Sequence, residues 1–523
     1  MTARPIGEPD AACPPRFNMA AYCIASSATA RADATALCVF AGGGPDFAVR
    51  SWTYRELSDA VGGIAAGLAR LDLHRGDRII VALPNSPEYA FTVFAAIAAG
   101  LIAVPVSPAL TPREVAAIAA DCGAAAIALD DGATGTSIEL PPHIHMIDRT
   151  TISADAAAGA RLRACDTAAD DPAYIVYTSG TTSRPKGVLH AHRAAWGRRP
   201  MYHGWYGITP ADRMLHAGAF NWTFTLGTGL TDPWAVGACA IVHVGDKTPA
   251  LWPLLIRASR ATLFAAVPGV YRQILKSSAS ERIDLGALRH GLMAGEKPQP
   301  GLVAEWQQRT GTGLYEALGM SELSTFISAS PTIGWREGRA GKAQPGRRVA
   351  ILPAAGGTTP LPPGQEGLIA VDRRDAGLML GYWQRADEET AVFRGDWFVG
   401  GDLGVMDGDG WIEHRGRADD IMKPLGYRVA PQEIEAVLAS HAAVAEAACT
   451  EVEVKAGVRL ILAALVLREG ATPPGEVELR EHAAARLAAY KVPHLYRVLD
   501  ALPRTANGKV MRKALTASDG VAL

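Results

Sequence analysis

The order of hydrophobic and polar positions predicts an α/β fold over most of the chain. Short aliphatic runs such as residues 78–83, Arg-Ile-Ile-Val-Ala-Leu, have the length and β-branched content of buried strands. They alternate with longer, Ala-rich stretches such as residues 54–71 and 296–310, which have the length of helices. This alternation is typical of mostly parallel sheets covered by helices, so we predict layered sheets in a large N-terminal domain.

The pattern changes after Arg417. It predicts a helix over 431–441, strands over 444–452 and 459–467, a helix over 475–490 and a final extended segment. Charged and turn-forming residues surround Asp419, as is typical of a domain boundary. We therefore predict two domains, residues 1–418 and residues 419–523, of which the second is a small α+β unit.

Composition narrows the class of protein. The chain has 523 residues, of which 49% are hydrophobic and 20% charged, so it can bury a substantial core in more than one domain. Its formal net charge of -2 gives no general attraction to nucleic acid, which we do not expect as a partner. The seven cysteines lack metal-binding spacing, and the N-terminus lacks the apolar core of a signal peptide. A reducing cytoplasm is the predicted location.

One uncharged stretch has the length of a membrane span. Residues 89–110 carry no charge, but Gly100, Pro105 and Pro108 interrupt them. We predict a buried helix, a turn and a short strand here, and no membrane span.

The segment most informative about chemistry covers residues 174–187, a predicted strand followed by a loop of small residues that ends in a lysine. Glycine allows the backbone to approach a ligand, hydroxyls donate hydrogen bonds and the lysine supplies positive charge, so the loop can wrap a polyphosphate. The candidate residues are Thr178, Ser179, Gly180, Thr181, Thr182 and Lys186. It is not a Walker A loop, because no glycine directly precedes Lys186 and no Ser or Thr follows it. Taken alone, it could also be a Ser/Thr-rich surface turn.

This segment resembles the phosphate-binding signature of the adenylate-forming superfamily, which includes acyl-CoA synthetases, peptide-synthetase adenylation domains and luciferases. Further segments similar to family motifs follow in the family's order along nearly the whole chain. The resemblance implies a large N-terminal α/β domain with a small mobile C-terminal lid. It also implies ATP, Mg²⁺ and coenzyme A as cofactors, and a small carboxylic acid as substrate.

Three segments are similar to nucleotide-binding motifs of this family. Residues 318–322 imply a hydroxyl at the α-phosphate, Ser321, and a magnesium-binding carboxylate, Glu322, with Gly319 and Met320 beside them. Residues 294–298 resemble the turn against adenine and imply Gly295 and Glu296, although Glu296 alone could be an acid at a helix N-terminus. Residues 397–402 resemble the ribose-binding segment and imply Asp402, with Gly401 in place of the usual small hydroxylated residue.

Two further segments imply the residues of the lid. Residues 415–428 resemble the superfamily hinge, in which Arg417 lies near the ribose and α-phosphate and Asp419 is the pivot. The same stretch implies that Lys423 and Gly426 approach the site after the lid rotates for thioester formation, and Arg428 is a further candidate for cofactor binding. Residues 503–509 match the motif whose lysine, here Lys509, bridges carboxylate and α-phosphate oxygens and offsets the charge that builds up during adenylation.

The acyl pocket is predicted between the phosphate loop and the adenine turn, in residues 218–229. Phe220, Trp222, Thr223 and Gly227 are the candidate lining residues, although packing in the core is an equal alternative for each aromatic. Similarity to benzoate-type and medium-chain acyl-CoA synthetases implies an aromatic, alicyclic or medium-chain acid.

These segments together predict an ATP-dependent carboxylate–CoA ligase that forms an acyl-adenylate and pyrophosphate and then an acyl-CoA thioester. One alternative is a stand-alone adenylating enzyme that loads a carrier protein, and a second is a non-catalytic nucleotide-binding protein. A dinucleotide-binding oxidoreductase is disfavoured, because residues 41–45 do not form a GxGxxG motif. The sequence makes no prediction of the oligomeric state.

Overall fold

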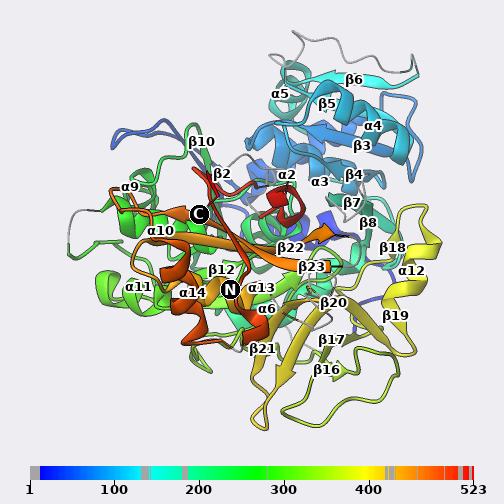
Figure 1. Ribbon diagram of the computed structural model, residues 1–523. Helices are drawn as coiled ribbons and strands as arrows, with labels where there is room; N and C mark the ends of the chain where they lie inside the picture. Colours follow the sequence, from blue (N-terminus) through cyan, green and yellow to red (C-terminus); the bar gives the residue numbers. More distant parts are fainter. Residues whose placement is uncertain are drawn as a thin grey trace. The chain divides into compact units, whose positions relative to one another are not determined.

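The computed structural model describes residues 12–130, 141, 143–178, 186–278, 281–418, 422, 429, 431–455, 458–487, 489–504, 510–516 and 521–522 (Figure 1). The chain divides into two compact units, one of residues 1–349 and 371–398 and the other of residues 350–370 and 399–523. The predicted boundary between residues 418 and 419 falls inside the second unit, and it stays a prediction.

The largest sheet of the first unit has the strand order β15-β14-β13-β12-β11-β9-β10-β1-β2. The strands from β13 to β1 in this order run parallel to one another, and the outer strands are antiparallel to their neighbours. The strands are β1 (Thr35–Ala41), β2 (Ala48–Thr53), β9 (Arg213–His216), β10 (Cys239–Val244), β11 (Leu263–Ala266), β12 (His290–Ala294), β13 (Gly313–Met320), β14 (Ser324–Ser328) and β15 (Lys342–Ala343).

The second sheet of this unit has the order β18-β8-β7-β4-β3-β5-β6. Strands β7, β4, β3, β5 and β6 are parallel, whereas β8 and β18 are antiparallel to their neighbours. The strands are β3 (Arg78–Ala82), β4 (Ile102–Pro105), β5 (Ala124–Leu129), β6 (His145–Asp148), β7 (Pro172–Thr178), β8 (Lys186–Ala191) and β18 (Gly381–Tyr382).

Helices of the first unit begin where the sequence supplies capping groups. Thr53 and Glu56 form a capping box at the start of α2, and the Ser86 side chain caps α3. Figure 1 shows α4 and α5 beside β5 and β6. The helices are α1 (Ser26–Ala30), α2 (Tyr54–Leu68), α3 (Pro87–Ala98), α4 (Pro112–Cys122), α5 (Arg149–Ala158), α6 (Arg199–Met201), α7 (Thr223–Leu226), α8 (Asp232–Val236), α9 (Leu251–Ala258), α10 (Pro268–Ser277), α11 (Leu302–Thr310) and α12 (Ala386–Val392).

Two expectations for local structure have clear outcomes. The uncharged stretch of residues 89–110 forms the buried end of α3, a turn and β4, as predicted. The helix expected to begin at Glu296 begins at Leu302, so that boundary was wrong. Pro298 and Pro300 explain the difference, because proline removes a backbone donor and disfavours helical conformation in the residue before it.

Two smaller sheets complete the described structure. One has the order β16-β17-β20-β19, with β21 paired to β20, and the other has the order β22-β23-β24-β25. The elements are β16 (Val349–Leu352), β17 (Glu366–Asp372), β19 (Phe393–Arg394), β20 (Trp397–Met406), β21 (Ile412–Arg417), β22 (Val444–Lys455), β23 (Val458–Leu467), β24 (Leu495–Val498), β25 (Val521–Ala522), α13 (Pro431–Ala439) and α14 (Glu476–Ala484).

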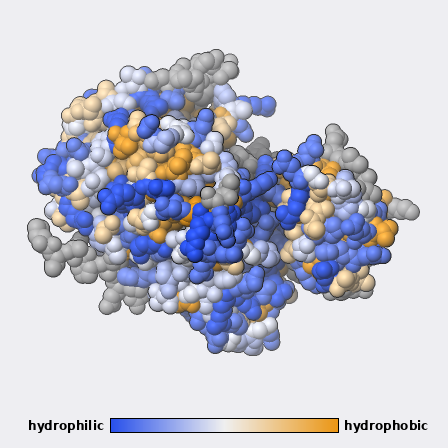
Figure 2. Space-filling model, turned by 90° about the vertical axis from the view of Figure 1, so that its left-hand side faces the viewer, coloured by the Kyte–Doolittle hydropathy of each residue, from blue (hydrophilic) through white to orange (hydrophobic). Residues whose placement is uncertain are grey.

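The distribution of apolar side chains fits these layers. Buried aliphatic and aromatic residues fill the spaces between helices and sheets, with a separate cluster around β22, β23 and α13. On the face drawn in Figure 2, hydrophilic residues predominate and hydrophobic ones gather in limited patches. No helix in the described parts of the chain combines the length and apolar character that a membrane crossing requires. The predicted α/β class with a C-terminal α+β part is confirmed.

Candidate functional site

The loops that follow four parallel strands of the large sheet meet at one edge. β9 ends at His216, β11 at Ala266, β12 at Ala294 and β13 at Met320. Ligands of open α/β sheets bind outside the carboxyl ends of the strands. The predicted acyl segment follows β9, the predicted adenine turn follows β12 and the predicted phosphate and magnesium residues follow β13. The fold therefore brings these three segments to a common edge.

Asn85 joins the second sheet to this edge. It follows the carboxyl end of β3. Its side-chain amide forms two hydrogen bonds with the backbone of the acyl segment. Asn85 Nδ2 donates to the Gly218 carbonyl at 2.8 Å, and the Phe220 N–H donates to Asn85 Oδ1 at 3.1 Å. The start of the acyl segment is thus fixed against β3.

Lys186 and Glu322 are linked through Tyr382. Lys186 is paired with Thr178 across β7 and β8, and its Nζ lies 3.7 Å from the centre of the Tyr382 ring. The Tyr382 hydroxyl donates to Glu322 Oε1 at 2.8 Å. Lys186 Nζ also lies 3.1 Å from Glu388 Oε2. The predicted phosphate-binding cation and the predicted magnesium-binding carboxylate therefore belong to one connected group.

His190 fixes the backbone at Ser321. Its Nε2 lies 2.8 Å from the Ser321 carbonyl oxygen, and its ring stacks on Tyr174 with centroids 4.7 Å apart. Burial lowers the pKa of His190 to about 4, so the neutral ring donates through Nε2 at physiological pH. This contact holds the turn that carries Ser321 and Glu322.

The predicted adenine turn has a visible structural role. Gly295 has φ +100°, a conformation that favours glycine. Glu296 Oε1 accepts a hydrogen bond from the Gly269 N–H at 3.1 Å, at the N-terminal end of α10. Gly319 lies so close to β14 that a β-carbon would stand 2.7 Å from the Ser324 carbonyl oxygen. Glu296 thus caps a neighbouring helix, and its contact with adenine stays a prediction.

The four predicted acyl-pocket residues lie in different surroundings. Phe220 is buried and packs on Tyr89 at 5.6 Å between ring centres, which is the alternative of core packing. Trp222 and Thr223 are only partly buried at the start of α7. A β-carbon on Gly227 would stand 2.1 Å from the guanidinium of Arg198, so Arg198 fills the space at that glycine.

Arg198 is the centre of a buried polar network that the sequence did not predict. It forms a bidentate pair with Asp232, with two N–O distances of 2.7 Å, and donates to Ser324 Oγ at 2.6 Å. The Tyr206 hydroxyl donates to Asp232 Oδ2 at 2.8 Å and lies 2.7 Å from Thr228 Oγ1. Ser324 has φ +71°, which is rare for a residue with a side chain. The network therefore fixes the strained residue at the start of β14.

Two other polar groups of the same segment have no such partners. His216 Nδ1 accepts a hydrogen bond from the Gly218 N–H at 2.9 Å, but Nε2 is buried without a partner in the described part of the chain. The Thr225 hydroxyl is likewise buried and unpartnered there. Burial lowers the pKa of His216 to about 3, and Lys247 and Arg198 act in the same direction.

The second unit places Asp402 and Arg417 opposite each other on β20 and β21. Asp402 is buried, and His414 Nε2 lies 2.9 Å from its Oδ1. Arg417 Nη1 donates to the Gly400 carbonyl at 3.0 Å. Gly401 has φ +89°, and a β-carbon there would stand 2.9 Å from Arg417 Nη2, which accounts for glycine at this position. The ribose-binding role of Asp402 stays a prediction.

The remaining predicted residues lie outside the described part of the chain. They are Ser179, Gly180, Thr181 and Thr182 of the phosphate loop, Asp419, Lys423, Gly426 and Arg428 of the hinge, and Lys509. Among described residues, the sequence analysis missed Tyr382, His190, His414 and Asn85. Only His190 gave a usable signal, because it lies close to the phosphate loop in the sequence.

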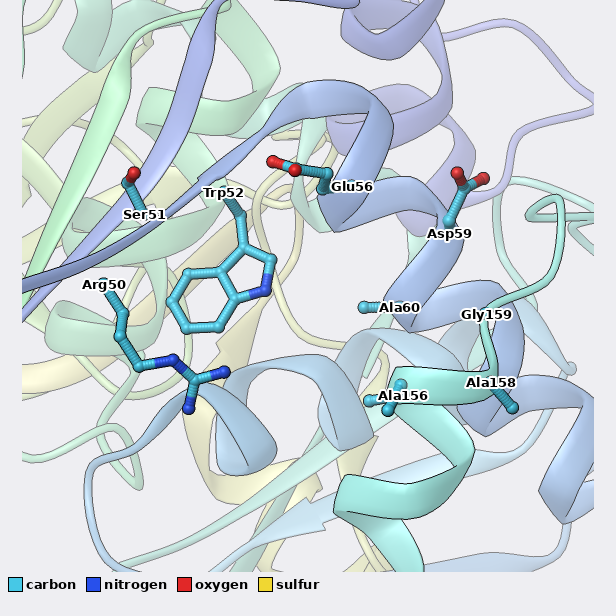
Figure 3. A pocket seen from close by; sticks show the side chains of 10 residues that line it. Arg50, Ser51, Trp52, Glu56, Asp59, Ala60, Ala156, Ala158 and Gly159 are labelled. Carbon is cyan, nitrogen blue, oxygen red and sulfur yellow. The ribbon is translucent and has the colours of Figure 1, made fainter.

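A separate recess lies between β2 and the ends of α2 and α5. Its volume is about 620 Å³, and Figure 3 shows Trp52 and Arg50 on one side and Glu56 and Asp59 on the other. The Arg50 guanidinium lies 4.7 Å from the centre of the Trp52 ring. None of the described site residues predicted from the sequence lines this recess, so it is not the predicted site.

Glu322 is the predicted metal-binding residue, and its surroundings suit a weakly held cation. The described residues contain no group of three or more His, Cys, Asp or Glu side chains placed to hold a metal. Magnesium is commonly held by one or two carboxylates together with substrate phosphates and water. A single carboxylate beside a phosphate-binding lysine is compatible with that arrangement.

Comparisons with known proteins cover nearly the whole chain. Residues 24–383 match the family model described as AMP-binding enzyme, and residues 433–509 match the AMP-binding enzyme C-terminal domain. The chain is 30% identical over 493 residues to a 3-hydroxybenzoate–CoA/4-hydroxybenzoate–CoA ligase of Thauera aromatica, covering 90% of this chain and 92% of the relative.

Two further similar proteins are an acyl-coenzyme A synthetase and an anthranilate CoA ligase. The chain is 28% identical over 495 residues to the mitochondrial acyl-coenzyme A synthetase ACSM3 of Mus musculus, covering 90% of this chain and 84% of the relative. The structure of the anthranilate CoA ligase AuaEII in complex with anthranoyl-AMP aligns with a TM-score of 0.86 at 26% identity, over 97% of this chain and 98% of that one.

Proposed function

Because the chain belongs to the AMP-binding enzyme family, we propose that it is an ATP-dependent CoA ligase for a ring carboxylate. The predicted family, the α/β fold and the class of carboxylate–CoA ligase are confirmed by the comparisons. The ring carboxylate is the further step, supported by the hydroxybenzoate and anthranilate ligases among the similar proteins.

One structural observation supports a ring-containing acid as the substrate. Aromatic rings from three elements pack beside the acyl segment: Phe224 of α7 lies 4.4 Å from His216 at the end of β9 and 5.8 Å from the buried Trp205, ring centre to ring centre. Trp222 lies at the start of α7, two residues before Phe224. Aromatic side chains favour offset or edge contacts with other rings, so such a segment suits a flat ring better than a long flexible chain.

In the proposed reaction, a carboxylate oxygen attacks the α-phosphorus of ATP and pyrophosphate leaves, which forms the acyl-adenylate. The CoA sulfur then attacks the acyl carbon and AMP leaves. We assign phosphate binding to Thr178, Lys186 and Ser321, ribose binding to Asp402 with Arg417 nearby, and the bridging charge in adenylation to Lys509. Lys423 and Gly426 are assigned to the thioester step.

Glu322 would hold Mg²⁺ together with the phosphates. The cation would neutralise part of the negative charge that repels an attacking carboxylate. Tyr382 keeps Glu322 oriented through its hydrogen bond of 2.8 Å, and Lys186 places a second positive charge beside the same ring. With ATP bound, these residues would contact the phosphates and help to orient them for attack by the carboxylate.

The test is pyrophosphate release with ATP and Mg²⁺ over benzoates, alicyclic acids and straight-chain acids, each with and without CoA. We expect release with ring acids that CoA stimulates. Glu322→Gln should lower kcat on the order of 10²-fold, as does loss of a charge-stabilising group in other enzymes. Glu305→Gln, a change of an exposed acid on α11, is the matched control.

The other outcomes separate the alternatives. Release with an acid that CoA never stimulates would support loading of a carrier protein instead. Equal use of straight-chain and ring acids would contradict the proposed substrate class. An unchanged rate in Glu322→Gln would remove that residue from the metal site.

A further inference from the structure

Lys186, to which phosphate binding is assigned, has an anionic partner within the protein. Its Nζ lies 3.1 Å from Glu388 Oε2 and over the Tyr382 ring, 3.7 Å from the ring centre. Both partners come from the segment of β18 and α12. The side chains of Lys186 and Glu388 are 21% and 38% exposed, so a solute can reach the ion pair.

The backbone explains why Glu388 lies beside this lysine. β18 pairs with β8, the strand that begins at Lys186 (Figure 1). The Trp383 N–H donates to the Gly187 carbonyl at 2.8 Å, and α12 begins shortly afterwards at Ala386. Glu388 belongs to the first turn of α12. Backbone hydrogen bonds therefore keep this turn near the start of β8.

A second cation lies near the other oxygen of the Glu388 carboxylate. Arg385 Nη1 is 3.9 Å from Glu388 Oε1, and Arg385 Nη2 donates to Asp121 Oδ1 at 3.3 Å. The Tyr177 hydroxyl donates to the other Asp121 oxygen at 2.6 Å. Asp121 thus keeps Arg385 in place, and a Glu388 carboxylate that leaves Lys186 still has a cation within reach.

This ion pair has a consequence for the binding of a polyphosphate. A carboxylate 3.1 Å from the Lys186 ammonium repels a phosphate that approaches the same ammonium. Water screens a partly exposed pair, so the exchange of one anion for another has a small free-energy cost. A triphosphate carries several negative charges against the single charge of Glu388. The phosphate is therefore the stronger competitor for Lys186.

We propose that Glu388 is a placeholder for the phosphates of ATP. It holds Lys186 before ATP binds, and a phosphate oxygen then displaces its carboxylate, which moves to Arg385. This inference rests on the proposed function and concerns the affinity for ATP within it. Glu388 is a positioning residue that lowers the affinity for ATP and leaves the chemical steps unchanged.

The experiment measures the Kd for ATP with Mg²⁺ by calorimetry, without acid or CoA. It also measures kcat and the KM for ATP and for the acid in CoA-dependent pyrophosphate release. Glu388→Gln keeps the shape of the side chain and removes its charge. Asp387→Asn is the matched control, because Asp387 is an exposed acid of the same helical turn. Thermal unfolding of each variant checks that the protein is folded.

We expect Glu388→Gln to lower the Kd and the KM for ATP by about 2- to 5-fold, as for the loss of an exposed ion pair. The values of kcat and of the KM for the acid should stay near those of the parent. Asp387→Asn should change the Kd by less than about 1.5-fold, because its charge is screened. Added salt should narrow the difference between the parent and Glu388→Gln.

The remaining outcomes overturn the inference or separate it from the proposed function. An unchanged Kd in Glu388→Gln would show that Glu388 does not compete with ATP, and a higher Kd would show that it helps to hold ATP. An equal effect in Asp387→Asn would assign the change to net charge and overturn the role of Glu388. Tighter ATP binding in Glu388→Gln without CoA-stimulated release for any acid would support the inference and remove only the proposed ligase reaction.

Discussion

The Arg198 network and the His216–Thr225 pair each include a threonine of the acyl segment, Thr228 and Thr225, and differ in how their polar atoms are hydrogen-bonded. Arg198 donates through all three guanidinium nitrogens to Asp232, Ser324, Thr228 and Tyr206. His216 Nε2 and Thr225 Oγ1 have no partner among the residues that the structure describes. Both groups are almost fully buried. Burial alone therefore does not show whether a polar side chain is hydrogen-bonded within the described structure.

This difference separates two tasks within the acyl segment. The Arg198 network stabilises the conformation of the chain around Thr228 and Asp232, because Arg198 connects Asp232 to Ser324 at the start of β14. The open pair leaves hydrogen-bonding capacity unused, at a cost of about 1–3 kcal/mol for each unpaired group. Proteins tolerate such local costs mainly at functional sites. Substitution of one residue from each group tests this difference.

The largest effect is expected from Arg198→Met. The change leaves Asp232 buried without its counter-charge, which typically costs about 3–5 kcal/mol. We expect the free energy of unfolding, measured in urea, to fall by that amount. The double variant Arg198→Met, Asp232→Leu should recover most of the loss, because a buried ion pair can be replaced by apolar groups at little cost. A double variant as unstable as the single one would show that packing of Arg198, and not charge, dominates.

The pH dependence of stability gives the next effect. The folded-state pKa of His216 is about 3, below the ordinary value of 6.5, because the ring is buried and Lys247 and Arg198 lie nearby. In the unfolded chain His216 is protonated below about pH 6.5, whereas in the folded chain it stays neutral down to about pH 3. The free energy of unfolding therefore decreases as the pH falls from about 6.5 toward 3. One such group accounts for up to about 1.4 kcal/mol per pH unit.

His216→Asn removes this titrating group, so the free energy of unfolding of the variant should depend less on pH below about 6.5. The measurement is urea unfolding of the parent and the variant at pH 7.5, 6 and 5. The variant should lose less stability than the parent between pH 6 and 5, by up to about 1.4 kcal/mol. The same loss in both proteins would contradict the assignment of a neutral, buried His216.

Local patterns predicted the elements and the order of the motifs well. The alternation of strands and helices gave the α/β class, and the segments around Lys186, Glu322 and Asp402 were found by their similarity to family motifs. Boundaries were less certain: the helix after the adenine turn begins at Leu302 and not at Glu296, because prolines intervene.

The contacts that complete the site could not be predicted, because they join residues far apart in the sequence. Tyr382 lies 60 positions from Glu322, and Asn85 lies 133 positions from Gly218. Gly227 shows a second limit. A glycine in an acyl segment suggests room for a ligand, but the Arg198 guanidinium occupies that room. Contacts between residues so far apart in the sequence become visible only in the three-dimensional structure.

The smallest and sharpest prediction compares two threonines three positions apart. Thr225 and Thr228 are both fully buried, but Thr228 Oγ1 lies 2.7 Å from the Tyr206 hydroxyl and Thr225 Oγ1 has no described partner. Thr228→Val should cost about 1 kcal/mol, the usual net worth of a buried hydrogen bond, and it leaves Tyr206 with one contact fewer. Thr225→Val should be neutral or slightly stabilising, because it replaces an unpaired hydroxyl with a methyl group and breaks no bond. Urea midpoints at equal m-values measure the difference. If Thr225→Val were as destabilising as Thr228→Val, the Thr225 hydroxyl would have a hydrogen-bond partner within the protein.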